Sequence, residues 1–170
     1  MITILGIDPG SRHTGFGIIE STGSKSRHIA HGRINSIEGE MPQRLLKIFA
    51  GLQEIIREHG PAEIAIEETF VNRSNAQSAL VLGQARGAAM CAAAQSGLPV
   101  AEYAAAQVKV AIAGNGRAEK QQVQHMVKVL LNLREAPAAD AADALAVALC
   151  HAHVRGTRMR AGVVLNKAWG

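Results

Sequence analysis

Acidic residues at the ends of apolar segments are the side chains of this sequence best suited to chemistry. Asp8 ends the apolar run "ILGID" and is followed at once by Pro9 and Gly10. A carboxylate at the edge of an apolar strand loses hydration, so a cation or a polar group must meet it there. The alternative is that Asp8 caps its own backbone in an Asx-type turn at Pro9-Gly10.

Two further acidic segments lie at expected element ends. Glu67 and Glu68 follow the alternation "IAI", so one of them lies where that strand ends. Asp140 and Asp143 are three residues apart at the start of an apolar helix, which places both on one face. The structural alternatives are solvated strand-end glutamates and aspartates that complement a helix dipole.

Strand ends and a helix start can converge at one edge of an α/β sheet, where active sites collect. Four carboxylates brought together there raise one another's pKa unless cations neutralise them. Two divalent ions would do so. Because the ligands are hard oxygens with no cysteine pattern beside them, the pattern favours Mg²⁺ or Mn²⁺ over zinc.

Other polar motifs carry a weaker signal. His151 and His153 are two residues apart on an expected helix and point in nearly opposite directions, so we interpret them as surface or packing residues. The glycines of "AGNGRAEK", residues 113–120, fit a plain turn better than a phosphate-binding loop.

The elements that must position the acids follow from the apolar spacing. Strands are expected over residues 2–8, 14–20, 26–36, 62–70 and 98–104, the first three as an antiparallel meander. Helices are expected over 42–59, 75–97, 118–132 and 138–154, with a short helical piece from Gln107. This order predicts an α/β fold with helices on the faces of a mixed sheet.

Composition limits the chain to one domain of ordinary type. It has 170 residues, 48% of them hydrophobic and 19% charged, so a second domain of normal size does not fit. The formal charge of +4 suits a polyanionic partner. Cys91 and Cys150 are expected to be buried, reduced thiols. We predict one domain over residues 1–154 and a basic, loosely ordered tail over 155–170.

The chain starts directly in a strand pattern, and no apolar run approaches ~18 residues. The expectation is therefore a cytoplasmic protein with neither a signal peptide nor a membrane span.

Five segments, in order and spacing, closely resemble the bacterial RuvC family of Holliday-junction resolvases, which belong to the RNase H-like nuclease superfamily. They are "GIDPGSRHTGFG", "AIEETF", "SALVLGQARGAA", "EYAAAQVKVAIAGNGRAEKQQVQHMV" and "ADAADALAVALCHAH". The resemblance covers about residues 2 to 154. It implies an RNase H-like single domain, with a mixed five-stranded sheet flanked by helices.

Carried over residue by residue, the resemblance also implies a catalytic site. Its acids would be four residues, called the acidic quartet below: Asp8, Glu67 (rather than Glu68), Asp140 and Asp143. They would be both catalytic residues and ligands of two Mg²⁺ ions, with Mn²⁺ also supporting activity.

The DNA contacts implied by the resemblance come from two regions. Lys109 in "QVKV" and Lys120 in "RAEK" would lie near the scissile phosphate. Phe70 would stack on or wedge against an unpaired base, and Asn72 and Arg73 of the same loop would contact DNA.

The function implied is cleavage of two symmetry-related strands of a four-way DNA junction after branch migration by RuvA and RuvB. A homodimer suits this substrate. Helix 75–96 is the candidate interface because Gly83 and Gly87 permit close approach, although packing on the protein's own sheet is equally physical.

Three other classes of protein share part of this pattern. An actin-like kinase would need a duplicated domain, for which 170 residues are too few. An RNase H-like nuclease acting on RNA would share the fold and the acids. A non-catalytic junction-binding protein would be expected to lack one or more of the acids, and all are present.

Overall fold

The computed structural model describes residues 1–22, 25–68 and 76–160. These residues form five strands and five helices, in the order expected from the apolar spacing. The strands are β1 (Ile2–Asp8), β2 (His13–Thr22), β3 (Lys25–Asn35), β4 (Glu63–Glu67) and β5 (Val100–Tyr103). The helices are α1 (Met41–His59), α2 (Ala76–Gln95), α3 (Ala105–Ala113), α4 (Lys120–Leu130) and α5 (Ala139–Arg160).

The strands make one mixed sheet in the order β3-β2-β1-β4-β5. β1, β2 and β3 pair antiparallel, whereas β4 pairs parallel with β1 and with β5. A meander of three strands followed by two strands that return through helices produces this order. The predicted mixed five-stranded sheet is therefore confirmed.

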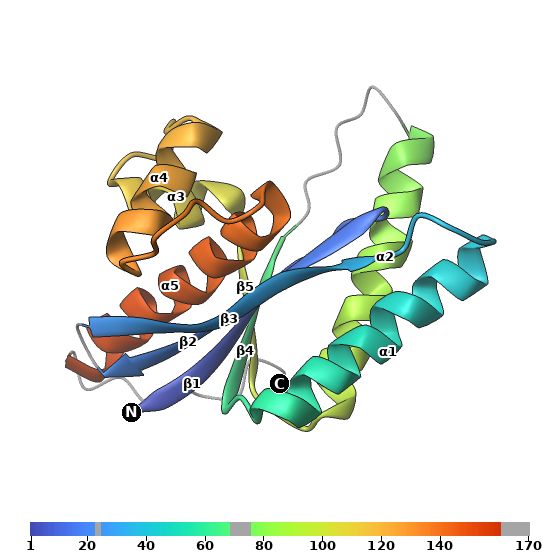
Figure 1. Cartoon of the computed structure of the whole chain (residues 1–170), viewed down its shortest axis with the longest axis horizontal. Coiled ribbons are helices and arrows are strands. Elements are labelled where there is room, and N and C mark those ends of the chain that lie inside the picture. The colour runs from blue at the N-terminus through green and yellow to red at the C-terminus, as the bar shows by residue number, and fades with distance from the viewer. Residues whose placement is uncertain (23–24, 69–75, 161–170) are drawn as a thin grey trace.

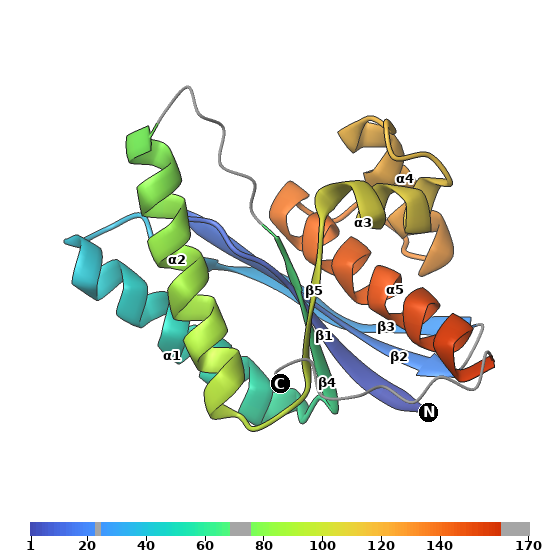
Figure 2. The same ribbon diagram turned by 180° about the vertical axis from the view of Figure 1, so that it is seen from behind.

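Helices cover both faces of the sheet. α1 and α2 lie on one face, and α3, α4 and α5 lie on the other (Figures 1 and 2). Alternation along β1 divides the core accordingly, because successive side chains point to opposite faces. Leu5 and Ile7 join the cluster under α1 and α2, while Ile4 joins the cluster under α5.

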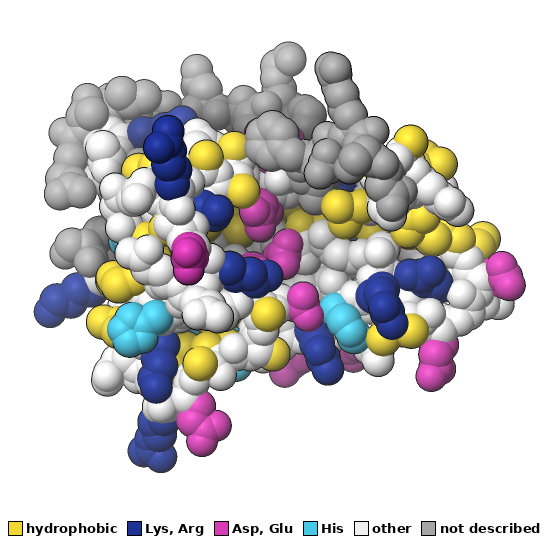
Figure 3. Space-filling model, turned by 90° about the horizontal axis from the view of Figure 1, so that it is seen from above, with side chains coloured by type: hydrophobic (Ala, Val, Ile, Leu, Met, Phe, Trp, Pro, Cys, Tyr) yellow, Lys and Arg dark blue, Asp and Glu magenta, His cyan; other side chains and the backbone are white. Residues whose placement is uncertain are grey.

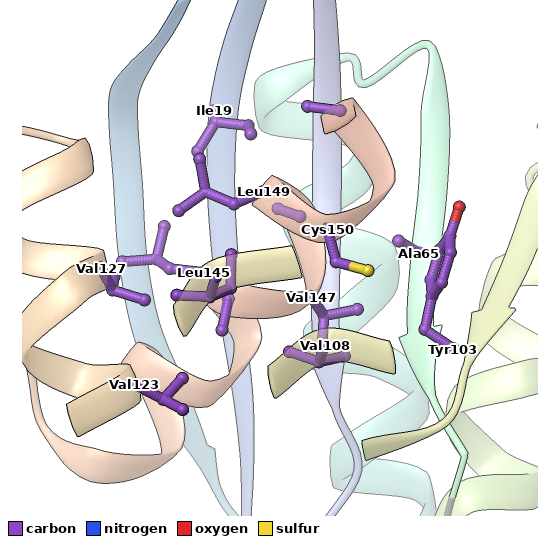
Figure 4. Close-up of a cluster of buried hydrophobic side chains, with 14 of the residues drawn as sticks. Ile19, Ala65, Tyr103, Val108, Val123, Val127, Leu145, Val147, Leu149 and Cys150 are labelled. Atoms are coloured by element: carbon purple, nitrogen blue, oxygen red, sulfur yellow. The ribbon is translucent and has the colours of Figure 1, made fainter. Parts of the chain in front are cut away.

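α5 is the central helix of its face. Leu145 and Leu149 are fully buried and lie near Ile19 of β2 and Val127 of α4 (Figure 4). Glycines let this helix approach the strands closely. A Cβ on Gly6 would overlap the carbonyl oxygen of Ala144, and a Cβ on Gly15 would overlap that of Asp140. The first turn of α5 is thereby held directly against β2.

The last helix is longer than the sequence pattern predicted. It continues to Arg160, six residues past the expected end at Val154, so the start of the predicted loose tail is helical. The extension is tied to the sheet, because Arg155 Nε donates to Glu63 Oε1 at 3.0 Å. Residues 161–170 lie outside the described part of the chain.

Other boundaries differ by a few residues. β4 ends at Glu67 rather than at 70, and the Glu68 N–H donates to Tyr103 O as the last bond of that edge. α3 begins at Ala105, two residues before the expected start. No helix within the described ranges is long and apolar enough to cross a membrane.

Candidate active site

The sheet register aligns two members of the acidic quartet. Asp8 is paired with Gly15 on β2, and Gly15 is paired with Arg33 on β3. On the other side, Glu67 follows directly after the pair Ile7–Ile66, which places it beside Asp8. Cross-strand neighbours share a face of the sheet. Arg33, Asp8 and Glu67 therefore form one row on the α5 face.

The other two acids come from the start of α5. Asp140 and Asp143 are three residues apart, in and just after the first turn, and so lie on the same side of the helix. Because the backbone at Asp140 rests against Gly15, this side lies over the row that contains Asp8. The structure thus brings together the four acids that the sequence predicted.

The closeness of the acids changes their protonation. Burial raises the pKa of Asp8 from 3.8 to about 8, with further increases from the charges of Glu67, Asp143 and Asp140. Burial and then the charge of Asp143 raise the pKa of Glu67 to about 6. Nearby carboxylates that are shielded from water cannot all be ionised at once without a cost in free energy. A cation placed among them lowers that cost, so the cluster favours binding of a cation.

Both predicted lysines lie at this cluster. Lys120, the first residue of α4, places Nζ 2.5 Å from Asp143 Oδ2, and this hydrogen bond is the main cause that raises the pKa of Lys120. Lys109 is close enough to Glu67 to lower the pKa of that carboxyl. A cavity of about 200 Å³ joins them. Its lining includes Glu67, Lys109, Lys120 and Asp143, with Val108 and Val123.

The donor set suits a hard divalent cation. It consists of carboxylate oxygens, which Mg²⁺ and Mn²⁺ prefer, and the mutual rise of their pKa shows that positive charge is favoured there. Within the described ranges, however, no three acidic, histidine or cysteine side chains converge closely enough to hold an ion as they stand. The acids are adjacent without forming a closed ligand cage.

Glu68 is separated from this cluster by the strand alternation. It follows Glu67 by one residue and so is directed away from the row on the α5 face. Of the sequence-predicted DNA contacts, Phe70, Asn72 and Arg73 lie outside the described residues.

One cation at the site was missed from the sequence. Arg33 Nη1 lies 4.0 Å from Asp140 Oδ2. The segment around Arg33 was predicted only as a polar edge strand. The signal that could have identified it is the pairing of β3 with β2, and this depends on a bulge between Ile18 and Ile19 that the apolar pattern does not reveal.

A second polar cluster was also missed. His151 is buried, as the packing interpretation predicted, and its Nε2 donates to Glu63 Oε2 at 2.6 Å. The Tyr103 hydroxyl lies 2.8 Å from His151 Nδ1 and donates to it in this tautomer. Glu63 begins β4 and Glu67 ends it, so this cluster joins α5 to the same strand that carries a quartet acid.

The face containing the quartet is mixed in charge. Seen from above, acidic side chains gather near the middle of this face, with lysine and arginine side chains on either side (Figure 3). Such an arrangement suits a phosphate chain that crosses acids and is held by flanking cations.

Comparisons with known proteins agree with this geometry. Residues 4–151 match the family model described as crossover junction endodeoxyribonuclease RuvC. The chain is 55% identical over 162 residues to the RuvC of Shewanella amazonensis, covering 95% of this chain and 93% of the relative. It is 54% identical to the RuvC of Stutzerimonas stutzeri, covering 100% of this chain and 97% of the relative.

A solved structure is similarly close. Thermus thermophilus RuvC in complex with Holliday junction substrate superposes with a TM-score of 0.86 at 37% identity. The match covers 92% of this chain and 96% of that one.

Proposed function

Because the chain belongs to the RuvC family of crossover junction endodeoxyribonucleases, we propose that it cuts Holliday junctions through the carboxylates of the acidic quartet. As a member of this family it is a hydrolase, a structure-specific DNA endonuclease of recombination and repair. The finer proposal concerns which residues act and how.

One observation carries the assignment of the site. Asp8 and Glu67 end adjacent strands in one row, and the first turns of α5 bring Asp140 and Asp143 over that row. The raised pKa values of Asp8 and Glu67 support the same assignment, because they report a cluster that favours cations.

We propose that the quartet holds two Mg²⁺ ions, with Mn²⁺ as a substitute. Bound there, the ions would lower the pKa of the attacking water and stabilise the leaving 3′-oxygen of a phosphodiester. The protein's own part is to hold the carboxylates in place. The rigid end of β1 and the contact of α5 with Gly15 serve this purpose.

The lysines have a complementary role in this scheme. Lys120 lies on Asp143, and Lys109 faces Glu67 across the cavity beside the acids. Two ammonium groups at the edge of the quartet can bind a phosphate that would otherwise be repelled. Phe70, Asn72 and Arg73 stay proposed DNA contacts on the strength of the resemblance.

Assembly belongs to the same proposal. A four-way junction has approximate two-fold symmetry and must be nicked twice, so a C2 dimer with one quartet per subunit matches it. The RuvA and RuvB branch-migration proteins are proposed as functional partners from the family resemblance. Location in the cytoplasm remains a prediction from the sequence.

The testing experiment uses a synthetic four-way DNA junction with and without Mg²⁺. We expect paired nicks on opposed strands, with 5′-phosphate and 3′-hydroxyl ends that a ligase can seal, only when Mg²⁺ is present. Linear duplex DNA of the same sequence and a four-way junction containing RNA are the control substrates. Equal cleavage of the duplex, or preference for the RNA-containing junction, would contradict the proposal.

A further inference from the structure

Arg33 lies in the same row as the catalytic acids but on the far edge of the sheet from the lysines. β3 is an edge strand, and Arg33 is aligned through Gly15 with Asp8. Gly15 has no side chain, and the backbone at Asp140 occupies the space above it, so Arg33 lies on one side of the start of α5 and Asp8 on the other. The alignment places a cation at the β3 side of the acids.

The ion pair of Arg33 with Asp140 is too long and too exposed to give this side chain a mainly stabilising role. The Nη1–Oδ2 distance is 4.0 Å, and the Arg33 side chain is 52% exposed. An exposed pair of this kind contributes only ~0–1 kcal/mol to stability. About half of the Arg33 side chain is therefore open to solvent at the edge of the site.

The charge pattern across the site suggests what the guanidinium of Arg33 binds. Lys109 and Lys120 line the cavity that contains Glu67, toward β4 and β5, whereas Arg33 is on β3. A DNA strand over the quartet crosses several negative charges, so it needs cations on both sides of them. A guanidinium binds phosphate oxygens through two parallel hydrogen bonds, which fixes position as well as charge.

We propose that Arg33 is a positioning residue that binds a backbone phosphate of the DNA strand on the β3 side of the acids. Without DNA, Asp140 keeps the guanidinium of Arg33 near the site. When DNA binds, the phosphate replaces Asp140 as the partner of Arg33. This inference rests on the proposed function, since it assumes that the scissile strand crosses the acidic quartet.

The test compares Arg33→Ala with Arg27→Ala. Arg27 is on the same strand and also has an acidic partner, Glu20 at 2.6 Å, but it pairs with the other end of β2. Junction binding is measured in EDTA over a range of salt concentrations, so the result does not depend on cleavage. We expect Arg33→Ala to bind about tenfold more weakly and to lower the salt slope by about one phosphate contact.

Two further measurements make the result decisive. Arg33→Lys should restore the salt slope but only part of the affinity, because lysine keeps the positive charge but cannot form the two parallel hydrogen bonds of a guanidinium. Thermal unfolding of Arg33→Ala should match that of the unmodified protein. An unchanged slope in Arg33→Ala, or the same drop in Arg27→Ala, would overturn the inference. If the unmodified protein neither binds nor cuts the junction, the proposed function fails instead.

Discussion

At the scale of single residues, the site depends on one-residue differences in strand register. Glu67 lies beside Asp8 in a row on the α5 face, and the next residue, Glu68, is directed away from it. A shift of one residue would exchange the two glutamates. Charge alone cannot distinguish them, so their substitution is a direct test of the register.

We expect Asp8→Asn and Glu67→Gln to lower the rate of cleavage at least a hundredfold, while the affinity for the junction stays nearly unchanged. Binding depends on phosphate contacts, whereas chemistry depends on the charged carboxylates. Glu68→Gln is the matched control and should cut at close to the normal rate. Single-turnover cleavage and gel-shift binding measure the two properties. Loss of activity in Glu68→Gln instead would show that the register is wrong.

Asp8 also predicts an unusual dependence of stability on pH in metal-free buffer. Its pKa of about 8 in the folded state lies above the ordinary 3.8, so the folded chain binds more protons than the unfolded chain between these values. The free energy of unfolding should therefore fall as pH rises through this window. Asp8→Asn removes this loss and should be more stable than the unmodified protein at pH 8, by about 1–3 kcal/mol.

Denaturant unfolding in EDTA at pH 5 and pH 8 measures this effect. The stability difference between Asp8→Asn and the unmodified protein should be larger at pH 8 than at pH 5, because pH 5 lies near the lower end of this window. An equal difference at both values would mean that Asp8 does not titrate as a buried, repelled acid. Addition of Mg²⁺ should selectively stabilise the unmodified protein at pH 8.

At the scale of elements, the position of α5 decides whether four acids from three elements can meet. The close contacts at Gly6 and Gly15 are with backbone atoms of the helix and, at Gly6, also with the Cβ of Ala148, and none of these atoms can turn aside. A backbone contact cannot relax without moving the whole helix. The glycines of β1 and β2 are thus as much a part of the site as the acids.

We expect Gly15→Ala to destabilise the protein by about 1–3 kcal/mol and to reduce cleavage strongly, because it displaces the turn that carries Asp140. Gly32→Ala is the control. It lies on the neighbouring strand, and its added methyl group would meet the Phe16 ring, a side chain that can shift. Thermal unfolding and single-turnover cleavage should show a smaller loss for Gly32→Ala. Equal cleavage by both variants would contradict the role of Gly15.

The cluster of Glu63, His151 and Arg155 holds the other end of α5. The hydrogen bond from His151 is the main cause that keeps the pKa of Glu63 below its usual 4.5, and Arg155 lowers it further. This stabilisation is therefore full above pH 4.5 and is lost as pH falls through the lower pKa of the folded state.

Glu63→Gln should accordingly cost about 1–3 kcal/mol of stability at pH 7, since it leaves a nearly buried histidine and an arginine without their carboxylate. The difference from the unmodified protein should shrink as pH is lowered below 4.5. Glu54→Gln, in an exposed pair with Arg57 on α1, is the control and should change stability by less than about 0.5 kcal/mol. Urea unfolding across this pH range checks both.

The features read correctly from the sequence are those with a local cause. Alternation and helical spacing predicted each element, and the apolar runs that end in Asp8 and Glu67 predicted that these two acids lie at strand ends. Arg33 and the Glu63–His151 pair could not be found this way. In each pair the two residues are far apart in the chain. Arg33 meets Asp140 only because of the bulge in the β2–β3 pairing, and Glu63 meets His151 only because of where α5 lies on the sheet.

The extension of α5 had the same origin. Residues 155–160 have weak apolar periodicity and clustered arginines, which predicted a loose tail. The extension is stabilised by the ion pair of Arg155 with Glu63, a residue of β4 that is distant in sequence. Tertiary contacts override local pattern at such places.

At the scale of the whole molecule, the exposed surface of α2 bears on assembly. The alanines at 85, 89, 92 and 93 are buried against the sheet side, whereas Gly83 and Gly87 face outward. The sequence left open whether these glycines serve the protein's own sheet or another helix. Since a Cβ at either position would meet no atom of the described residues within 4 Å, the glycines are not needed for packing within that part of the subunit.

We therefore expect Gly87→Leu to fold normally but to weaken dimerisation and to leave singly cut junctions, because the two nicks lose their coupling. His125→Leu adds the same side chain at an exposed position of α4, on the opposite face of the sheet, and should keep both properties. Analytical ultracentrifugation at micromolar concentration gives the oligomeric state, and cruciform plasmid cleavage separates nicked from linear products. A dimer with paired cuts in Gly87→Leu would place the interface elsewhere. A monomeric unmodified protein that still cuts both strands together would contradict the symmetric arrangement itself, since one quartet would then have to reach two opposed strands in turn.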